Sequence, residues 1–113
     1  MPQAKRILKI SIERDIDEDP DTSYLEQDGF EKRLAEYRNS DFWFIGIRAK
    51  AAVAINSTWQ QVTSGGLWGI ESDSDPEYLK SIELEELNSL RGILHELGFS
   101  KRAIAAAVKS PSV

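Results

Sequence analysis

Apolar and polar positions alternate along two stretches of the chain, and each alternation predicts a β-strand. Near the start, Leu8, Ile10 and Ile12 are separated by polar residues, which is the period-two pattern of a half-buried strand. A longer alternation from Phe42 to Ile55 is the strongest strand signal in the sequence. One of its faces is predicted to be core: Trp43, Ile45, Ile47, Ala49, Ala51, Val53 and Ile55. The other face mixes apolar and basic residues and is predicted to be partly exposed to solvent: Phe42, Phe44, Gly46, Arg48, Lys50, Ala52 and Ala54.

A glycine-rich stretch then interrupts a shorter run of extended chain. Trp59 to Val62 is expected to return antiparallel to the long strand, and Leu67 to Ile70 is expected to continue the extended path. Between them, Thr63 to Gly66 must bend or bulge. We favour a bulge or hairpin that places Trp68 in the core. The alternative is that the glycines let a ligand or a partner backbone approach closely, since glycine lacks a Cβ.

Three segments have the pattern of amphipathic helices. Gly29 to Asn39 carries apolar residues at helical spacing and predicts a short helix. A long helix is expected to begin at a cap formed by Ser74 or Asp75 and to stop at Gly98. Its apolar stripe consists of Leu79, Ile82, Leu87, Leu90, Ile93, Leu94 and Leu97. Ser100 to Lys109 predicts a final, alanine-rich helix.

These elements follow the order β-α-β-β-α-α, and a chain of 113 residues is near the commonest size of one domain. The simplest architecture that buries the apolar stripes is an α+β fold, in which helices cover one face of a three-stranded, mainly antiparallel sheet. No linker divides the sequence. Residues 1–113 are therefore expected to form a single domain, with residues 110–113 as a short tail.

The composition excludes several classes of function. The chain has no cysteine and a single histidine, His95, so it lacks the ligands of the usual zinc sites and the nucleophile of a cysteine enzyme. It contains no nucleophile elbow and no phosphate-binding loop. We therefore expect a protein that is not an enzyme and uses no cofactor. The sequence shows no signal peptide and no membrane span, which predicts a cytoplasmic protein without a membrane partner.

Acidic residues are concentrated in two segments, although the net charge is only −5. Glu13 to Glu31 contains nine acids and one base, and Glu71 to Glu86 contains seven acids and one base. Carboxylates on a rigid scaffold can imitate phosphates and select a cationic partner. The leading hypothesis is a non-enzymatic module that occupies a basic protein surface, and the residues expected to contact it are Asp15, Asp17, Glu18, Asp19, Asp21, Glu71, Asp73, Asp75 and Glu77. The competing interpretation is that the acidic segments only keep the protein soluble.

The first acidic segment also has part of a calcium-loop pattern. Asp15, Asp17 and Asp19 occupy alternate positions, and Ser23 and Glu26 stand where such a loop places its later ligands. However, a proline replaces the glycine that the sharp turn requires, and a strand rather than a helix precedes the loop. A solvated acidic loop is the favoured interpretation, and a calcium or small-ligand site is the alternative.

Two glutamates, Glu83 and Glu86, fall within the angular range of the apolar stripe on the long helix. A partly buried carboxylate pair can serve in acid–base catalysis. More often such a glutamate meets a basic residue of the sheet, and Arg48 and Lys50 are available for this pairing. A third alternative is that both glutamates lie beyond the sheet edge, in water.

The end of the chain, from Ile93 to Ile104, resembles a helix-turn-helix, with a glycine in the turn and an apolar residue after it. Proteins of this class read DNA with the second helix. Lys101, Arg102 and Lys109 are placed for phosphates, but the alanines of this helix offer no base-edge hydrogen bonds, and an acidic domain opposes phosphate binding. We favour an ordinary helix hairpin and expect no direct nucleic-acid binding. DNA binding by these helices is the alternative function.

Three stretches of the chain resemble a group of small uncharacterised proteins of bacteria, phages and plasmids: Tyr24–Phe30, Phe42–Arg48 and Thr63–Ser72 (TSGGLWGIES). The similarity spans most of Ile7 to Leu97. It transfers no activity and no site residue, and it implies only a context of mobile genetic elements. Acidic phage proteins of this size include inhibitors of CRISPR and restriction systems, some of which mimic DNA. An anti-CRISPR or anti-restriction inhibitor is therefore the specific form of the leading hypothesis.

Overall fold

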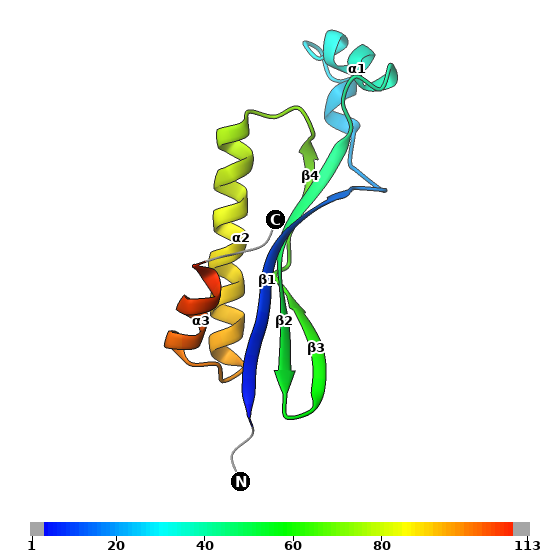
Figure 1. Ribbon diagram of the computed structural model, residues 1–113. Helices are drawn as coiled ribbons and strands as arrows, with labels where there is room; N and C mark the ends of the chain where they lie inside the picture. Colours follow the sequence, from blue (N-terminus) through cyan, green and yellow to red (C-terminus); the bar gives the residue numbers. More distant parts are fainter. Residues whose placement is uncertain (1–3, 110–113) are drawn as a thin grey trace.

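The computed structural model describes residues 4–109, so the tail predicted at residues 110–113 lies outside the described residues. The molecule is elongated, with extents of 62 × 24 × 20 Å (Figure 1). Its elements, in chain order, are β1 (Lys5–Ile16), the 3-10 helix η1 (Ser23–Glu26), α1 (Glu31–Arg38), β2 (Phe44–Ile55), β3 (Thr58–Thr63), β4 (Leu67–Glu71), α2 (Pro76–Glu96) and α3 (Lys101–Val108).

β2 is the centre of an antiparallel sheet. β1 pairs along one edge of β2 over its whole length, from Lys5 opposite Ile55 to Ile16 opposite Ile45. β3 and β4 share the other edge, since β3 pairs with the second half of β2 and β4 pairs with the first half. The α+β class is confirmed. The third strand of the prediction is present as two pieces, so the sheet has four strands.

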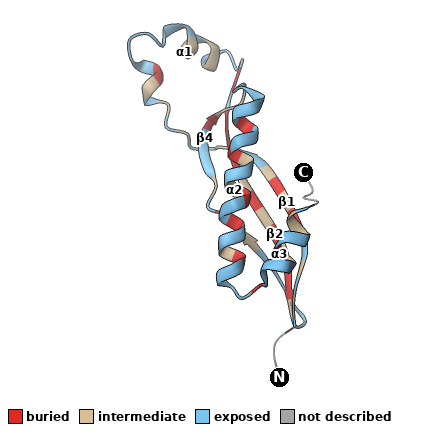
Figure 2. Cartoon of the chain, turned by 90° about the vertical axis from the view of Figure 1, so that its left-hand side faces the viewer, coloured by how far each residue is buried: buried red, intermediate tan, exposed pale blue. Residues whose placement is uncertain are grey.

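α2 and α3 cover one face of this sheet (Figures 1 and 2). The core between them consists of Ile10, Ile12, Ile45, Ile47, Ala49, Ala51, Val53, Ile70, Leu79, Ile82, Leu87, Leu90, Leu94, Phe99 and Ile104. α2 has the predicted cap, because the Asp75 side chain accepts a hydrogen bond from Glu77 N. It also stops where predicted, because Gly98 adopts the left-handed φ of +96° that favours glycine. Leu97 departs from the predicted apolar stripe, because its side chain is exposed.

A bulge in β1 corrects the predicted alternation of that strand. The pairing with β2 shifts between Ile7 and Lys9, so Leu8 is left without a paired residue. Leu8 is therefore exposed, and Ile7 packs against the core in its place. One inserted residue reverses which alternate side chains face the core, and a period-two pattern read from the sequence does not show where this happens.

η1 and α1 form a small lobe at the end of the molecule opposite the β2–β3 turn (Figure 1), and we call it the distal lobe. The distal lobe has its own apolar cluster, made of Leu25, Phe42 and Phe44 with Tyr24, Leu34 and Tyr37 packed against them. The sequence prediction placed Trp43 on the core face of this strand and Phe42 and Phe44 on the mixed face. This is wrong, because Trp43 is 53% exposed whereas Phe42 and Phe44 are buried. The start of β2 therefore buries the other set of alternate side chains, which face the lobe instead of α2.

Candidate functional site

The predicted contact residues of the two acidic segments, within Asp15–Asp21 and Glu71–Glu77, lie toward the end of the molecule that carries the distal lobe, and we call this the acidic end (Figure 1). Asp17 joins them. Its backbone N donates to Phe44 O at 2.9 Å, and its Oδ2 accepts from Gly69 N at 2.9 Å. The fold thus gathers at one end two acidic segments that are far apart in the sequence.

Arg33 of α1 compensates part of this charge. Its guanidinium lies 3.2 Å from Glu71 Oε2 and donates to both carboxylate oxygens of Asp73. It also lies 3.7 Å from Glu36 and 3.6 Å from the centroid of the Phe42 ring. The hydrogen bond from Arg33 holds the pKa of Asp73 below its ordinary value, because a neighbouring cation favours the ionised form. Glu71 and Asp73 therefore tie the distal lobe to the β4–α2 loop.

Tyr24 of η1 provides a second tie to the same carboxylate. Its hydroxyl donates to Glu71 Oε2 at 2.9 Å. Burial and, after it, the hydrogen bond to Glu71 raise the pKa of Tyr24 to about 12. The phenol is therefore neutral near pH 7 and remains a donor. Glu71 is consequently held in one position by Tyr24 and Arg33.

Two further acids among the predicted contact residues, Asp75 and Asp21, stabilise the local backbone by accepting hydrogen bonds from residues close in sequence. Asp75 caps α2 by accepting from Glu77 N at 2.9 Å. Asp21 accepts from both Ser23 N at 3.0 Å and Ser23 Oγ at 2.7 Å. These hydrogen bonds lower the pKa of Asp21, since they favour its charged form. Both carboxylates still face solvent, because both residues are exposed.

The other predicted contact residues have weaker ties. Asp15 lies 3.8 Å from Arg48. Glu18, Asp19 and Glu77 are exposed, and their carboxylates have no basic side chain within ion-pair distance among residues 4–109. These three residues are therefore among the acids at the acidic end that no basic side chain of the described residues compensates.

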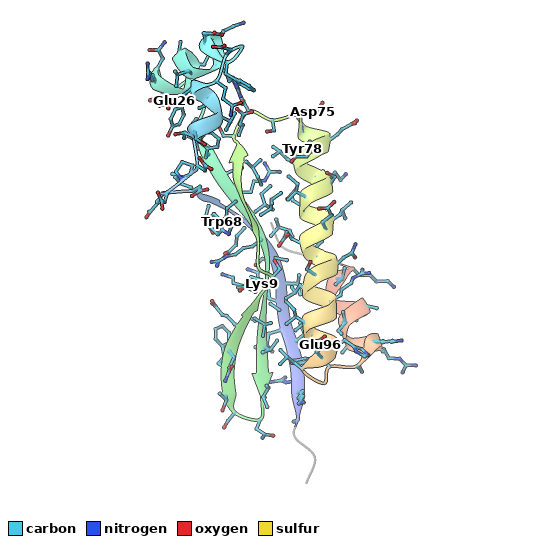
Figure 3. The ribbon with its side chains drawn as sticks, turned by 180° about the vertical axis from the view of Figure 1, so that it is seen from behind. Lys9, Glu26, Trp68, Asp75, Tyr78 and Glu96 are labelled. Atoms are coloured by element: carbon cyan, nitrogen blue, oxygen red, sulfur yellow. The ribbon has the colours of Figure 1, made fainter. Side chains whose placement is uncertain are left out.

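A hollow of about 320 Å³ lies beside β4 at the acidic end, and we call it the β4 hollow. It is lined by Tyr24, Leu67, Trp68, Gly69, Ile70, Glu71, Ser74 and Tyr78. Trp68 is 45% exposed and Tyr78 is 52% exposed. Figure 3 shows Trp68 on the side of the sheet away from α2 and Tyr78 on the first turns of α2. Exposed aromatic surface is therefore combined with carboxylates at this end of the molecule.

Trp68 does not lie in the core, in contrast to the sequence prediction. The pairing of β2 with β4 shifts between Ile45 and Ile47, so the two strands are bulged around Gly46. The indole lies against Gly46, where a Cβ would come within 2.1 Å of ring carbon Cε3. Because Gly46 has no Cβ, the Trp68 indole can pack directly against the β2 backbone, on the face of the sheet that the helices leave uncovered.

Glu86 of α2 holds the bend between β3 and β4. Its Oε1 accepts from Ser64 Oγ at 2.7 Å and from Gly66 N at 2.8 Å. Ser64 Oγ in turn accepts from Ala49 N at 2.9 Å, which satisfies a backbone donor of β2 at the break between its two neighbours. The predicted bend at residues 63–66 is therefore present, and these contacts give it a structural role.

Arg48 and Lys50 do not meet the glutamates of α2, because they face the opposite side of the sheet. Both pair with Glu13 of β1: Arg48 Nε lies 2.9 Å from Glu13 Oε2, and Lys50 contacts the other oxygen. The hydrogen bonds from Lys50 and then from Arg48 lower the pKa of Glu13. Glu83 of α2 pairs instead with Arg14 at 3.1 Å. The prediction of a basic sheet partner is therefore correct in kind for Glu83, but the partner is a different residue.

The aromatic residues of the β4 hollow were not identified by sequence reasoning. Trp68 follows two glycines in an otherwise apolar run, a setting that favours a core assignment over a surface one. Tyr78 precedes Leu79 and lies off the apolar stripe of α2, so helical periodicity alone could have marked it as an exposed aromatic.

Within residues 4–109, no three His, Asp or Glu side chains are grouped in a way that could hold a metal ion. None of the helices in this part of the chain is both long and apolar enough to cross a membrane. Comparison of the chain with protein-family models, curated proteins and solved structures finds no match.

Proposed function

We propose that this chain is a non-enzymatic binding module whose acidic end takes a cationic segment of a protein partner. The observation that carries the proposal is the half-exposed indole of Trp68, seated on Gly46 beside the β4 hollow, at the same end as the uncompensated acidic residues. Aromatic faces and carboxylates are the groups that recognise Lys and Arg side chains.

The two kinds of group are expected to contribute differently. Buried aromatic anchors supply most of the affinity at protein interfaces, whereas surface charges mainly accelerate association and select the partner. We assign the affinity to Trp68 and Tyr78, and the steering to Glu18 and Asp19. Glu71 lines the hollow and is already fixed by Arg33 and Tyr24, so a cation that enters meets a carboxylate that needs no further ordering.

The proposal extends to the class of partner. A protein surface that normally holds nucleic acid presents Lys and Arg in rows, and these match carboxylates displayed on a rigid scaffold. Together with the resemblance to proteins of phages and plasmids, this supports an inhibitor of the anti-CRISPR or anti-restriction type. Such an inhibitor would occupy the basic surface in place of nucleic acid.

A short poly-arginine peptide is the first probe, with isothermal titration calorimetry at low and moderate salt as the measurement. Trp68→Ala is expected to weaken binding about tenfold, because an aromatic anchor is lost. Reversing Glu18 and Asp19 to lysine is expected to weaken binding at low salt and to flatten its salt dependence. The matched control reverses Glu85 and Glu96, two exposed acids of α2 outside the acidic end.

The control variant should bind the peptide nearly as well as the wild type. Equal losses in the control and the acidic-end variant would mean that only net charge matters, and the proposal would fail. A pull-down from the native host with wild-type protein and Trp68→Ala then tests the class of partner. Recovery of a basic nucleic-acid-binding protein by the wild type alone is the expected result.

A further inference from the structure

Residues of α2 and α3 line a groove of about 560 Å³. α3 packs beside the half of α2 that lies away from the acidic end (Figure 1). Four of the residues that line the groove are basic: Arg91 and His95 of α2, Lys101 of α3, and Lys109 directly after α3. All four are exposed. Arg91 and His95 are about one helical turn apart, and Lys101 and Lys109 are about two turns apart, so the groove lies between two basic rows. We call it the basic groove.

The floor of the basic groove is formed by small and apolar residues, among them Gly92 and Ile104. A Cβ placed on Gly92 would meet no heavy atom within 4 Å, so the space above this glycine is open. An anion can therefore approach the basic rows without displacing a side chain from the floor.

The basic surface continues on the other side of α3. A second groove, of about 440 Å³, is lined by Lys5 and Arg6 of β1 and by alanines of α3. From Asn88 to Lys109, the sequence contains four Lys or Arg residues and one histidine against a single acid, Glu96. α3 is therefore flanked on both sides by basic residues from neighbouring elements.

We infer that α3 and the basic groove bind the phosphate backbone of a nucleic-acid duplex without reading its sequence. Lysine and arginine neutralise phosphates and release their counterions, which supplies most of the affinity in such binding. The cations extend along about 12 Å of helix and onto both of its sides, which suits a row of phosphates better than one small anion. This second activity uses residues separate from those of the proposed protein-binding function.

The overall acidity of the chain does not oppose this binding locally. The molecule is 62 Å long, and charges separated by more than about 8 Å are largely screened at physiological salt. The acidic residues at Asp15–Asp21 and Glu71–Glu77 lie toward the opposite end, so they do not neutralise the basic groove. The expectation that direct nucleic-acid binding is absent rested partly on the acidity of the whole domain, and the net charge does not show that acidic and basic residues lie toward different ends.

The residues of α3 also determine the mode of binding. Its alanines offer no hydrogen bonds to base edges, so phosphate contacts would fix position without sequence preference. No aromatic residue lines either groove beside α3 in the described part of the chain. Single-strand binders generally stack bases on aromatic rings, and this surface therefore favours a duplex.

The test is fluorescence anisotropy of a labelled DNA duplex with the full chain, over a range of salt beginning near 50 mM. Arg91→Gln, Lys101→Gln and Lys109→Gln are each expected to lower affinity about tenfold at the lowest salt and to reduce the salt slope by about one. Lys32→Gln and Lys80→Gln are the controls, because these exposed lysines do not line either groove. The control variants should bind like the wild type.

Duplexes of unrelated sequence should bind equally, and an unlabelled single strand should compete less well than an unlabelled duplex. No binding near 50 mM salt would overturn the inference, as would equal losses in the groove and control variants. Salt-sensitive self-association in sedimentation, lost in the groove variants without any DNA binding, would instead assign the groove to the acidic end of a second copy. Trp68→Ala should leave duplex binding unchanged, which separates this result from the test of the protein-binding function.

Discussion

The indole of Trp68 lies where a side chain at position 46 would stand, so two residues on neighbouring strands depend on each other. Because Gly46 has no Cβ, the ring approaches the backbone of β2 closely while part of it remains exposed. An aromatic residue fixed by its contact with a strand loses little conformational freedom when it binds a partner. In the proposed binding function, the glycine therefore acts through the position of its neighbour.

Gly46→Ala is expected to lower the free energy of unfolding by about 1–3 kcal/mol, because the new methyl group overlaps the indole. It should also weaken binding of the poly-arginine peptide, since Trp68 must move. Chemical denaturation and calorimetry measure these two effects. Gly92→Ala is the matched control: its Cβ meets nothing within 4 Å, and alanine favours a helix by up to about 1 kcal/mol. A loss of stability in the control equal to that in Gly46→Ala would contradict the steric argument.

Tyr24 gives a prediction that depends on pH. Its pKa in the folded protein is raised from the ordinary 10.0 to about 12, so the folded state favours the neutral phenol. The stability contributed by this shift is complete below pH 10 and is lost as the pH rises toward 12. Ultraviolet titration of tyrosinate should show one group ionising near pH 12, and Tyr24→Phe should remove that step. Retention of the step in Tyr24→Phe would refute the assignment.

At the scale of elements, the contact between α2 and the β3–β4 bend fixes the break in the third strand. Glu86→Ala would leave Gly66 N without its acceptor and Ser64 Oγ with only the longer contact to Ala49 O at 3.4 Å, and we expect a loss of about 1–3 kcal/mol of unfolding free energy. Glu86→Gln keeps one acceptor oxygen and should cost less. The neighbouring Glu85→Ala is the control, because Glu85 is exposed. Chemical denaturation measures all three, and equal effects of Glu86→Ala and Glu85→Ala would contradict this role.

Much of the element order could be predicted from the sequence, because long periodic patterns are strong signals. The apolar stripe of α2, its cap at Asp75 and its stop at Gly98 each follow from local chemistry. The errors have one physical cause, which is that alternation assumes regular pairing and a single core. The bulge at Leu8 breaks the regular pairing, and the distal lobe gives Phe42 and Phe44 a second core.

The acidic residues of the candidate site could be predicted from the sequence, but their contacts in the fold could not. The carboxylates of both acidic segments are visible in the sequence, whereas their partners are not. Arg33 reaches Glu71 and Asp73 from a different element, and such long-range ion pairs leave no local pattern. The sequence shows the basic residues of α2 and α3 separately, but it does not show that they line one groove. Arg91 and His95 precede the turn, and they lie near Lys101 only because the two helices pack together.

At the scale of the whole molecule, the fold separates charge along its length. The net charge of −5 hides an acidic end and a basic groove toward opposite ends of a body 62 Å long. The long strand β2 and the 21-residue helix α2 run between these regions. A protein of this shape can contact a basic protein and a nucleic acid at the same time, because the two surfaces share none of their assigned residues. The two proposed activities are therefore compatible within one molecule.

Arg33 is the main cationic link between the distal lobe and the β4–α2 loop. Arg33→Met removes the cation that joins α1 to Glu71 and Asp73, and only the hydrogen bond from Tyr24 to Glu71 remains. We expect the lobe to open locally, at a cost of about 1–3 kcal/mol, while the main core stays intact. In hydrogen exchange, the amides of Leu34 and Asn39 should exchange about tenfold or more faster, and amides of β2 paired with β3 should be unchanged. Arg38→Met, at an exposed position of the same helix, is the control, and faster exchange there of the same size would mean that α1 is only marginally stable by itself rather than held by Arg33.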